Sequence, residues 1–550
     1  MGIAAPRISP PYFTLFRLMP KKLDRDTYEW ALGHLKMEGD SDLFPAPFEI
    51  ESFKFNSDRL LDELEKLDIT NYEWTSGRRF VVPKEEFAFR NATQLDPVDS
   101  LVIAAIIRHI GQKIEDNRIR KSNRVVFSYR FNPQDDGRFY GDQTGWHDFW
   151  DHSLSKCKNT TSNFVLTADI SDFYNQIYHH TLGNELRDAG VKEQIVRVIE
   201  QNFLGSLTHG VSRGVPIGPH SVHLLAECSL NPVDQSLLSR GHDFCRYVDD
   251  FHFFCRSENQ ARMALYDFAE VLDKQQRLTP QKQKMEIMAV SDFMSLAEAM
   301  LIDRPLNDEE ETIINIIRKH SDGDPYATVN LGDLDDDELE AVDKDTLTDL
   351  IGMYLSKSDR NYPRIGWLLR RLSQVGAPGA IDFCLRHIRD LMPVLGDVAR
   401  YIMRASRNYE GDLETSGELI INALDEPVIK KNEYIQVVLV NLFSRVPGLN
   451  HINKLTSKYS GMSPSLKREI VLAAKAAGRS HWIKERKDEF DSSDVWLRRA
   501  ILRAAPELPG DESRHWLKKI KRGLSSQEKL IVWDSFNSRD LSLYGFNLNS

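Results

Sequence analysis

The spacing of apolar residues divides the chain into two parts of different character. After residue 350, apolar side chains recur every three to four positions, which predicts amphipathic helices. The clearest segments are Ile365–Leu372, Ile381–Ile402 (broken near Pro393), Ile435–Phe443, Leu466–Ala477 and Val495–Ala505. Helix stops are expected at glycines and prolines between them, and no strand-like alternation is evident after residue 300.

One helical segment recurs along the C-terminal part. The stretch LKREIVLAAK at 466–475 matches LRRAILRAAP at 497–506, at an offset of 31 residues. A period of this size suggests a stacked array of helical hairpins, loosely of the HEAT type. A plain helical bundle is the alternative, and one matched pair does not exclude it.

Residues 160–290 show a different pattern, typical of short strands. FVLTAD at 164–169 is an apolar run that ends in an acid. FCRYVDDFHFFC at 244–255 is aromatic and β-branched on both sides of an Asp-Asp pair, which predicts a β-hairpin with Asp249 and Asp250 at its tip. The expected fold class is therefore α+β, with a mixed part followed by an all-α part.

The acidic charge of the chain is concentrated in one place. The 550 residues contain 71 Lys+Arg and 82 Asp+Glu, a net charge of −11, and residues 301–350 alone carry −12. We expect this stretch to be a solvated connecting segment, with an interaction surface as the alternative. The predicted domains are then 1–300, with an N-terminal extension over about 1–100, the acidic segment 301–350, and the helical part 351–550.

The remaining charge does not exclude nucleic acid as a partner. Outside 301–350 the net charge is +1, and basic residues gather between Lys113 and Arg130 and over 451–550. The five cysteines are scattered without a CxxC pair, which fits a reducing cytoplasm. The longest apolar run, Leu101–Ile107, is far shorter than the roughly 20 residues that span a bilayer, and no signal peptide is evident. A soluble cytoplasmic protein without a membrane partner is expected.

Three acidic residues are candidates for metal-dependent chemistry. Transfer of a nucleotidyl group needs charge neutralisation and activation of a 3′-hydroxyl, which two Mg²⁺ ions supply. Asp169 at the end of one strand, with Asp249 and Asp250 at a hairpin tip, would provide the oxygen ligands that Mg²⁺ prefers. An Asp-Asp pair is also a common turn dipeptide, so the pair alone does not establish a site.

The surrounding segments strengthen this interpretation. ADISDFYNQIYHH (168–180), RGVPIGPHSV (213–222), RYVDDF (246–251) and LTPQKQK (278–284) together resemble, in order and spacing, the palm motifs of reverse transcriptases. The resemblance implies that Asp169, Asp249 and Asp250 bind the metals and are catalytic. It also implies that Tyr174 is the steric gate against the ribose 2′-OH, that Gly218 belongs to the turn under the base, and that Lys284 ends the basic motif.

More narrowly, DISDFYNQIYHH resembles the signature of the abortive-infection (Abi) reverse transcriptases of bacteria and prophages. This implies a fingers-palm domain followed by a HEAT-like helical domain, and Mg²⁺-dependent DNA synthesis from dNTPs without a template. It further implies priming by a protein hydroxyl, DNA covalently attached to the protein, a homo-oligomer, and a role in phage exclusion. Ile217 replaces the usual Gln of the palm turn and cannot hydrogen-bond there, which favours untemplated synthesis.

Two other functions stay open: a templated reverse transcriptase of the retron or group II type, and an inactive helical scaffold. Among cations before the palm, Arg130 is the first choice for binding the triphosphate. The priming residue is unknown, and Tyr12 and Tyr28 are trial candidates because an exposed, mobile hydroxyl is required.

Several polar residues near the motifs also have a structural interpretation. His180 and His252 are expected to be hydrogen-bonded structural histidines, and Asp172 is expected to cap the helix that follows it. For Tyr174, the alternative to a gate is an ordinary core aromatic.

Overall fold

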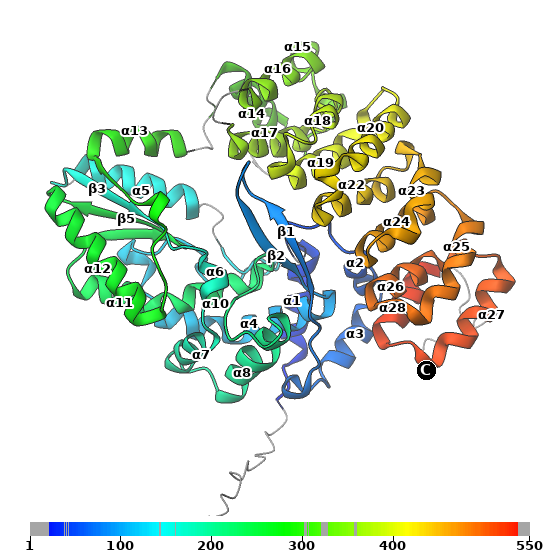
Figure 1. Cartoon of the computed structure of the whole chain (residues 1–550), viewed down its shortest axis with the longest axis horizontal. Helices are drawn as coiled ribbons and strands as arrows, with labels where there is room; N and C mark the ends of the chain where they lie inside the picture. The colour runs from blue at the N-terminus through cyan, green and yellow to red at the C-terminus, as the bar shows by residue number, and fades with distance from the viewer. Residues whose placement is uncertain are drawn as a thin grey trace, which may run out of the picture.

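The computed structural model describes residues 21–37, 39, 41, 43–141, 145–159, 161–301, 305, 307–320, 328–356 and 360–536. Figure 1 shows a mixed part on the left, in cyan to green, and an arc of helices at the top and right, in green to red, with the blue N-terminal helices between them. A two-stranded ribbon, β1 and β2, stands between them. Within the described ranges, no helix is both long enough and apolar enough to cross a bilayer.

The N-terminal part is helical except for this ribbon. Its elements are α1 (Arg25–Met37), α2 (Glu49–Phe55), α3 (Ser57–Leu64), β1 (Arg78–Pro83), β2 (Phe89–Gln94) and α4 (Pro97–Asn117). Helix α4 starts at a proline, and Asp96 caps it by accepting a hydrogen bond from the Val98 amide. In the antiparallel ribbon, Phe80 and Val82 are buried while Arg79 and Val81 are exposed, as the period of two requires.

The central sheet has four antiparallel strands in the order β4-β5-β3-β6. The strands are β3 (Phe164–Ala168), β4 (Phe244–Tyr247), β5 (Asp250–Cys255) and β6 (Glu286–Ala289). The helices of this part are α5 (Gly145–Asn159), α6 (Phe173–Gln176), α7 (His179–Asp188), α8 (Glu193–Arg197), α9 (Leu204–Leu207), α10 (His223–Ser229), α11 (Asn231–Ser239), α12 (Glu258–Gln276) and α13 (Val290–Met300).

Helices cover both faces of the central sheet, which is why its strands are apolar on both sides. On one face, Phe251 and Phe253 pack against Phe268 of α12 with tilted and edge-to-face rings. On the other face, Val165 and Phe254 join a separate cluster with residues of α5 and α13. The sheet is therefore held from both sides, and β6 is its most exposed strand.

The arc consists of helices α14 to α28. They are α14 (Asp308–His320), α15 (Asp336–Ala341), α16 (Lys344–Leu355), α17 (Tyr362–Val375), α18 (Ile381–Arg386), α19 (Leu395–Ala405), α20 (Leu413–Asp425), α21 (Pro427–Lys430), α22 (Glu433–Arg445), α23 (Ile452–Lys458), α24 (Pro464–Ala476), α25 (Ser480–Arg486), α26 (Val495–Ala504), α27 (Gly510–Ile520) and α28 (Ser526–Phe536). The five predicted segments all lie in helices, with the expected break near Pro393. Gly376, between two of the predicted segments, ends α17 in the left-handed conformation.

The offset of 31 residues extends beyond the one matched pair. Helices α22, α24, α26 and α28 begin at Glu433, Pro464, Val495 and Ser526, so each helix starts 31 residues after the start of the preceding one. Each of the first three is capped by the side chain of the preceding residue, and each packs on the next. The arc therefore contains a regular repeat. Its assignment to the HEAT type remains a prediction.

Most of the described acidic side chains of 301–350 are exposed, as expected for a solvated segment, but the stretch is folded and is not a simple connector. Residues 308–320 and 336–355 are mainly helical, and the acidic runs occupy first helical turns, where negative charge is favourable. Glu310 is completely buried and pairs with Arg364 of α17. The acidic pattern thus reflects helix starts together with one buried ion pair.

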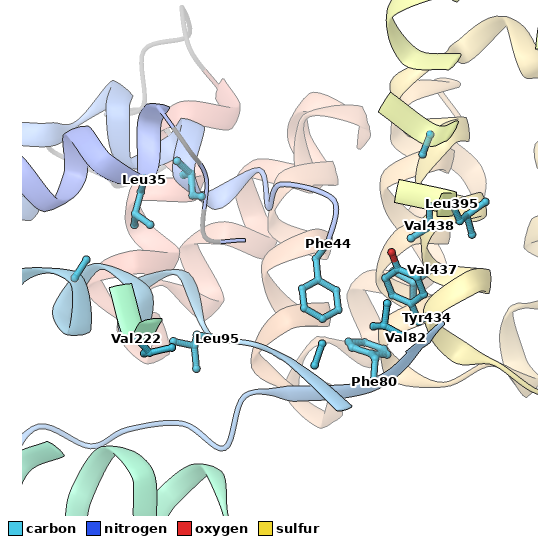
Figure 2. Close-up of a cluster of buried hydrophobic side chains, with 14 of the residues drawn as sticks. Leu35, Phe44, Phe80, Val82, Leu95, Val222, Leu395, Tyr434, Val437 and Val438 are labelled. Carbon is cyan, nitrogen blue, oxygen red and sulfur yellow. The ribbon is translucent and has the colours of Figure 1, made fainter. Parts of the chain in front are cut away.

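The arc is joined to the N-terminal part by a buried apolar contact. Figure 2 shows Phe44, Phe80 and Val82 facing Tyr434 and Val437 of α22. The Tyr434 hydroxyl also donates a hydrogen bond to the Leu43 carbonyl at 2.9 Å. The contact fixes the ribbon β1–β2 against the arc.

Two buried ion pairs add to this junction. Arg468 of α24 donates twice to Glu49, at 2.8 Å each, and Arg499 of α26 donates to Asp96 at 2.6 Å. All four side chains are nearly inaccessible to solvent. Since an unpaired buried charge is costly, these pairs favour a single placement of the arc.

Candidate active site

The three predicted acids meet at one end of the central sheet. Asp169 directly follows β3, and Asp250 begins β5. The last pair in the antiparallel register of β3 and β5 is Ala168 with Phe251. Asp169 and Asp250 are the next residue on each strand, so the ladder places these two acids opposite each other. Tyr247 pairs with Asp250 across the β4–β5 hairpin, which leaves Val248 and Asp249 as its turn. The predicted hairpin is confirmed.

The acids perturb one another. Burial, followed by the charges of Asp169 and Asp250, raises the pKa of Asp249 to about 7. Burial and the charge of Asp169 raise the pKa of Asp250 to about 6, although Lys284 and Lys84 act in the opposite direction. Full ionisation at neutral pH is therefore unfavourable unless further positive charge is supplied.

Lys284 supplies part of that charge. Its ammonium group donates a hydrogen bond to the Asp169 carboxylate, and the Gln281 amide donates to the Asp169 carbonyl at 2.8 Å. Burial alone would lower the pKa of Lys284, but its bond to Asp169 raises it. The segment that ends in Lys284 thus lies beside the acids, as the ordered motifs imply.

The residues fit a hard divalent cation. In the described part of the chain, no three carboxylate, histidine or cysteine side chains converge closely enough to enclose a metal ion. Mg²⁺ keeps several waters and is often bound by one or two carboxylates together with substrate phosphates, so an open set of acids suits it. The raised pKa values of Asp249 and Asp250 show that this end of the sheet favours added positive charge.

Tyr174, on the short helix α6, is close enough to Asp249 for its charge to act on the phenol. Its hydroxyl is hydrogen-bonded to Nδ1 of His223 at 2.7 Å, and its carbonyl accepts from the Val215 amide at 2.8 Å. Burial raises the pKa of Tyr174 well above its usual value, and the charge of Asp249 adds to this effect. The ring is therefore within electrostatic reach of the acids.

The glycine turn is joined to the ribbon strand β2. The Ile217 carbonyl accepts from the Thr93 amide at 2.8 Å, and a Cβ at Gly218 would lie 2.9 Å from the Thr93 carbonyl. Gly218 has φ +133°, a conformation that L side chains rarely adopt. Both the close approach and the dihedral angle therefore require glycine here.

A buried network that the sequence did not indicate holds the turn carrying Asp249. Val248 has φ +56°, which is strained for a β-branched residue. Its amide donates to Ser128 Oγ at 2.8 Å and its carbonyl accepts from Arg246 at 3.1 Å. Glu227 joins these groups, since it accepts from Ser128 at 2.5 Å and from Arg246 at 2.9 Å.

Arg130, the first choice for binding the triphosphate, has a largely buried side chain beside an acid. Its guanidinium donates to the Ile119 carbonyl at 2.9 Å and pairs with Glu115. Burial lowers the pKa of Arg130, and the charged groups that act on it are those of the internal network, Arg118 and Glu227 among them. Arg130 Nη2 thus bonds to Ile119 and pairs with Glu115, while Nε and Nη1 are buried without a hydrogen-bond partner among the described residues.

Other cations approach the acids instead. Lys84 follows β1, and its charge reaches Asp250. It borders a cavity of about 400 Å³ between the ribbon, α5 and the arc. Residues lining this cavity include Lys84, Arg90, Trp146, His147, Trp367 and Arg370. A lone lysine after a strand gave no signal in the sequence, because only its position relative to the sheet makes it relevant.

Of the two trial priming residues, Tyr28 lies within the described residues and Tyr12 does not. Tyr28 of α1 is completely buried, and its hydroxyl has no hydrogen-bond partner among the described residues. The expectation of an exposed hydroxyl is therefore wrong for Tyr28, because helix packing covers it.

The structural interpretations of three polar residues have different outcomes. His252 is buried and hydrogen-bonded to Ser153 Oγ at 2.9 Å, which confirms its structural role. His180 is instead exposed, 3.6 Å from Glu200. Asp172 occupies the cap position of α6, but its side chain makes no capping bond to the backbone.

An antiparallel sheet with three carboxylates at one end and Lys284 bonded to one of them suits metal-dependent nucleotidyl transfer. Residues 110–316 match the family described as reverse transcriptase (RNA-dependent DNA polymerase). The chain therefore carries a reverse transcriptase domain and is an enzyme of the DNA polymerase type.

Comparison with whole proteins adds only distant similarities. Apo telomerase from Candida tropicalis is 12% identical, with 67% of this chain and 69% of that chain covered and a TM-score of 0.31. Telomerase from Candida albicans, in complex with a TWJ fragment of telomeric RNA, is 12% identical over 74% and 70%, with a TM-score of 0.29. No curated protein matches the chain.

Proposed function

We propose that the protein is a Mg²⁺-dependent DNA polymerase of the Abi reverse-transcriptase group, which makes DNA from dNTPs without a template and starts from a hydroxyl of the protein. The observation that carries the proposal is the cluster of Asp169, Asp249 and Asp250 within the reverse transcriptase domain, with Tyr174 beside it.

In the proposed reaction a primer hydroxyl attacks the α-phosphorus of a dNTP. One P–O bond forms, the bond to pyrophosphate breaks, and the hydroxyl proton is released. Two Mg²⁺ ions held by the three acids would neutralise the phosphates and activate the hydroxyl. Lys84 and Lys284 would add positive charge for the triphosphate, and the Tyr174 ring would cover the ribose 2′ position.

Absence of a template is supported by the turn at 213–218. Ile217 has an apolar side chain, and its carbonyl is already bonded to Thr93. The side chain therefore cannot read a base pair by hydrogen bonding. A templated enzyme of the retron or group II type is the alternative that the same assay separates.

The test uses purified full-length protein, Mg²⁺ and labelled dNTPs without nucleic acid. We expect label that stays with the protein after phenol extraction and disappears on nuclease treatment. Asp249→Ala should abolish incorporation, while Asp151→Ala, an exposed acid on α5, should not affect it. Incorporation that requires a primed RNA template, label free of protein, or an active Asp249→Ala variant would each contradict part of the proposal.

The proposal extends to the cell, where we place the protein in the bacterial cytoplasm as a homo-oligomer that excludes phage. Plating efficiency of phages on bacteria expressing the wild type or Asp249→Ala tests this role. Protection that survives the substitution would separate defence from polymerisation. Light scattering of the purified protein tests the oligomer, and a monomer would contradict it.

A further inference from the structure

The hydroxyl of Tyr174 has a dedicated partner, and that partner is itself held in place. His223 Nδ1 lies 2.7 Å from the Tyr174 hydroxyl, and the two rings meet edge to face. On another side, Tyr129 stacks on the imidazole, with ring centroids 4.2 Å apart and planes 8° from parallel. The imidazole is thus fixed by stacking while it bonds to the tyrosine.

The partner belongs to the framework that holds the catalytic turn. His223 lies one helical turn before Glu227 on α10, and Tyr129 directly follows Ser128. Glu227 and Ser128 are the groups that bind around Val248. Two short segments, 128–129 and 223–227, therefore fix both the turn of Asp249 and the hydroxyl of Tyr174.

Both members of the bond are neutral. Burial lowers the pKa of His223 to about 3, and burial raises the pKa of Tyr174 well above its usual value. The phenol therefore keeps its proton, and it can donate that proton to the Nδ1 lone pair of a neutral imidazole.

We propose that His223 is a positioning residue that determines sugar specificity, by fixing the ring of Tyr174 against the ribose 2′ position. A ring can exclude a hydroxyl only if it does not yield when the hydroxyl approaches. A side chain that is free to turn between rotamers yields at small cost, whereas a bonded ring does not. The proposal rests on the polymerase function proposed above and adds a determinant of its choice between dNTP and NTP.

The test compares the ratio of kcat/KM for dATP and ATP between variants. His223→Phe keeps a ring for Tyr129 to stack on but removes the acceptor. Loss of a net hydrogen bond of ordinary strength should lower the ratio about 2- to 12-fold, mainly through faster use of ATP. Tyr174→Phe removes the other half of the bond and should give the same change, and the double variant should add nothing further.

Two further variants separate positioning from folding. His223→Asn offers an amide oxygen near the position of Nδ1 and should restore part of the ratio. His34→Phe removes another buried histidine, bonded to the Gly137 carbonyl at 2.9 Å, and should leave the ratio unchanged. Thermal unfolding of each variant checks that the compared proteins are folded.

The outcomes are distinguishable. An unchanged ratio in His223→Phe, an equal loss for both nucleotides without rescue by His223→Asn, or a wild type that uses dATP and ATP equally would overturn the proposal. If the wild type neither incorporates nor binds dATP with Mg²⁺ in equilibrium dialysis, the polymerase function itself fails, and this inference fails with it.

Discussion

Asp249→Asn should stabilise the metal-free protein at neutral and alkaline pH. The pKa of Asp249 is raised from 3.8 to about 7 by burial and by the charges of Asp169 and Asp250. The folded protein therefore binds this proton more tightly than the unfolded chain does. Ionisation destabilises the folded state progressively between pH 4 and pH 7, and the penalty is complete above pH 7.

The size of the penalty follows from the pKa change. A change from 3.8 to about 7 corresponds to about 4 kcal/mol, at about 1.4 kcal/mol for each tenfold change in proton affinity. Asp249 keeps some contact with solvent, which screens its charge, so about 2 kcal/mol is expected. If about 200 residues unfold together, a change of about 2 kcal/mol in the free energy of unfolding shifts the melting temperature by roughly 4–8 °C.

The assay is thermal unfolding in EDTA from pH 4 to pH 9, with wild type, Asp249→Asn and the exposed control Asp151→Asn. The melting temperature of Asp249→Asn relative to wild type should be near zero at pH 4 and rise to a plateau above pH 7. Added Mg²⁺ should stabilise the wild type and reduce the difference. A difference independent of pH, or a less stable Asp249→Asn above pH 7, would refute the electrostatic reasoning.

Two more predictions concern the buried networks. Arg499→Met leaves Asp96 buried without its ion-pair partner and should destabilise the junction by about 3–5 kcal/mol in chemical unfolding; a loss below about 1 kcal/mol would contradict this. Arg262→Met, at an exposed pair, should cost less than about 0.5 kcal/mol. Glu227→Gln removes the charge paired with Arg246 and should raise the Mg²⁺ concentration for half-maximal incorporation, whereas an unchanged Mg²⁺ dependence would show that the turn does not need this carboxylate.

The acids could be predicted from the sequence because their signals are local. The acid at the end of an apolar run (164–169) and the Asp-Asp pair between aromatic stretches (244–255) can each be recognised from a short continuous segment. The antiparallel sheet then needs only its register to bring them together. The five helical segments of the arc were equally local, since each has its own apolar periodicity.

The supporting groups could not be predicted because no local pattern in the sequence shows which charged residues become their partners. Arg246 is part of the RYVDD motif, but nothing local shows that it bonds to Asp234 and Glu227 from two other helices. Arg130 was selected because it lies in a basic cluster, and composition cannot show that Glu115 already neutralises it. A cluster of basic residues in the sequence does not show which of their side chains are exposed when several of them form buried ion pairs.

The repeat of 31 residues explains how the arc is attached to the polymerase part. Val437, Arg468 and Arg499 occupy the same position in three successive repeats, 31 residues apart. The first contributes to the apolar contact with the ribbon (Figure 2). The other two pair with Glu49 and Asp96. Helices repeated at a constant spacing present equivalent positions to the same side. The same position in three successive repeats therefore contacts the N-terminal part. The periodicity was visible in the sequence. The role of the two arginines was not, because the acids they pair with, Glu49 and Asp96, lie 419 and 403 residues earlier.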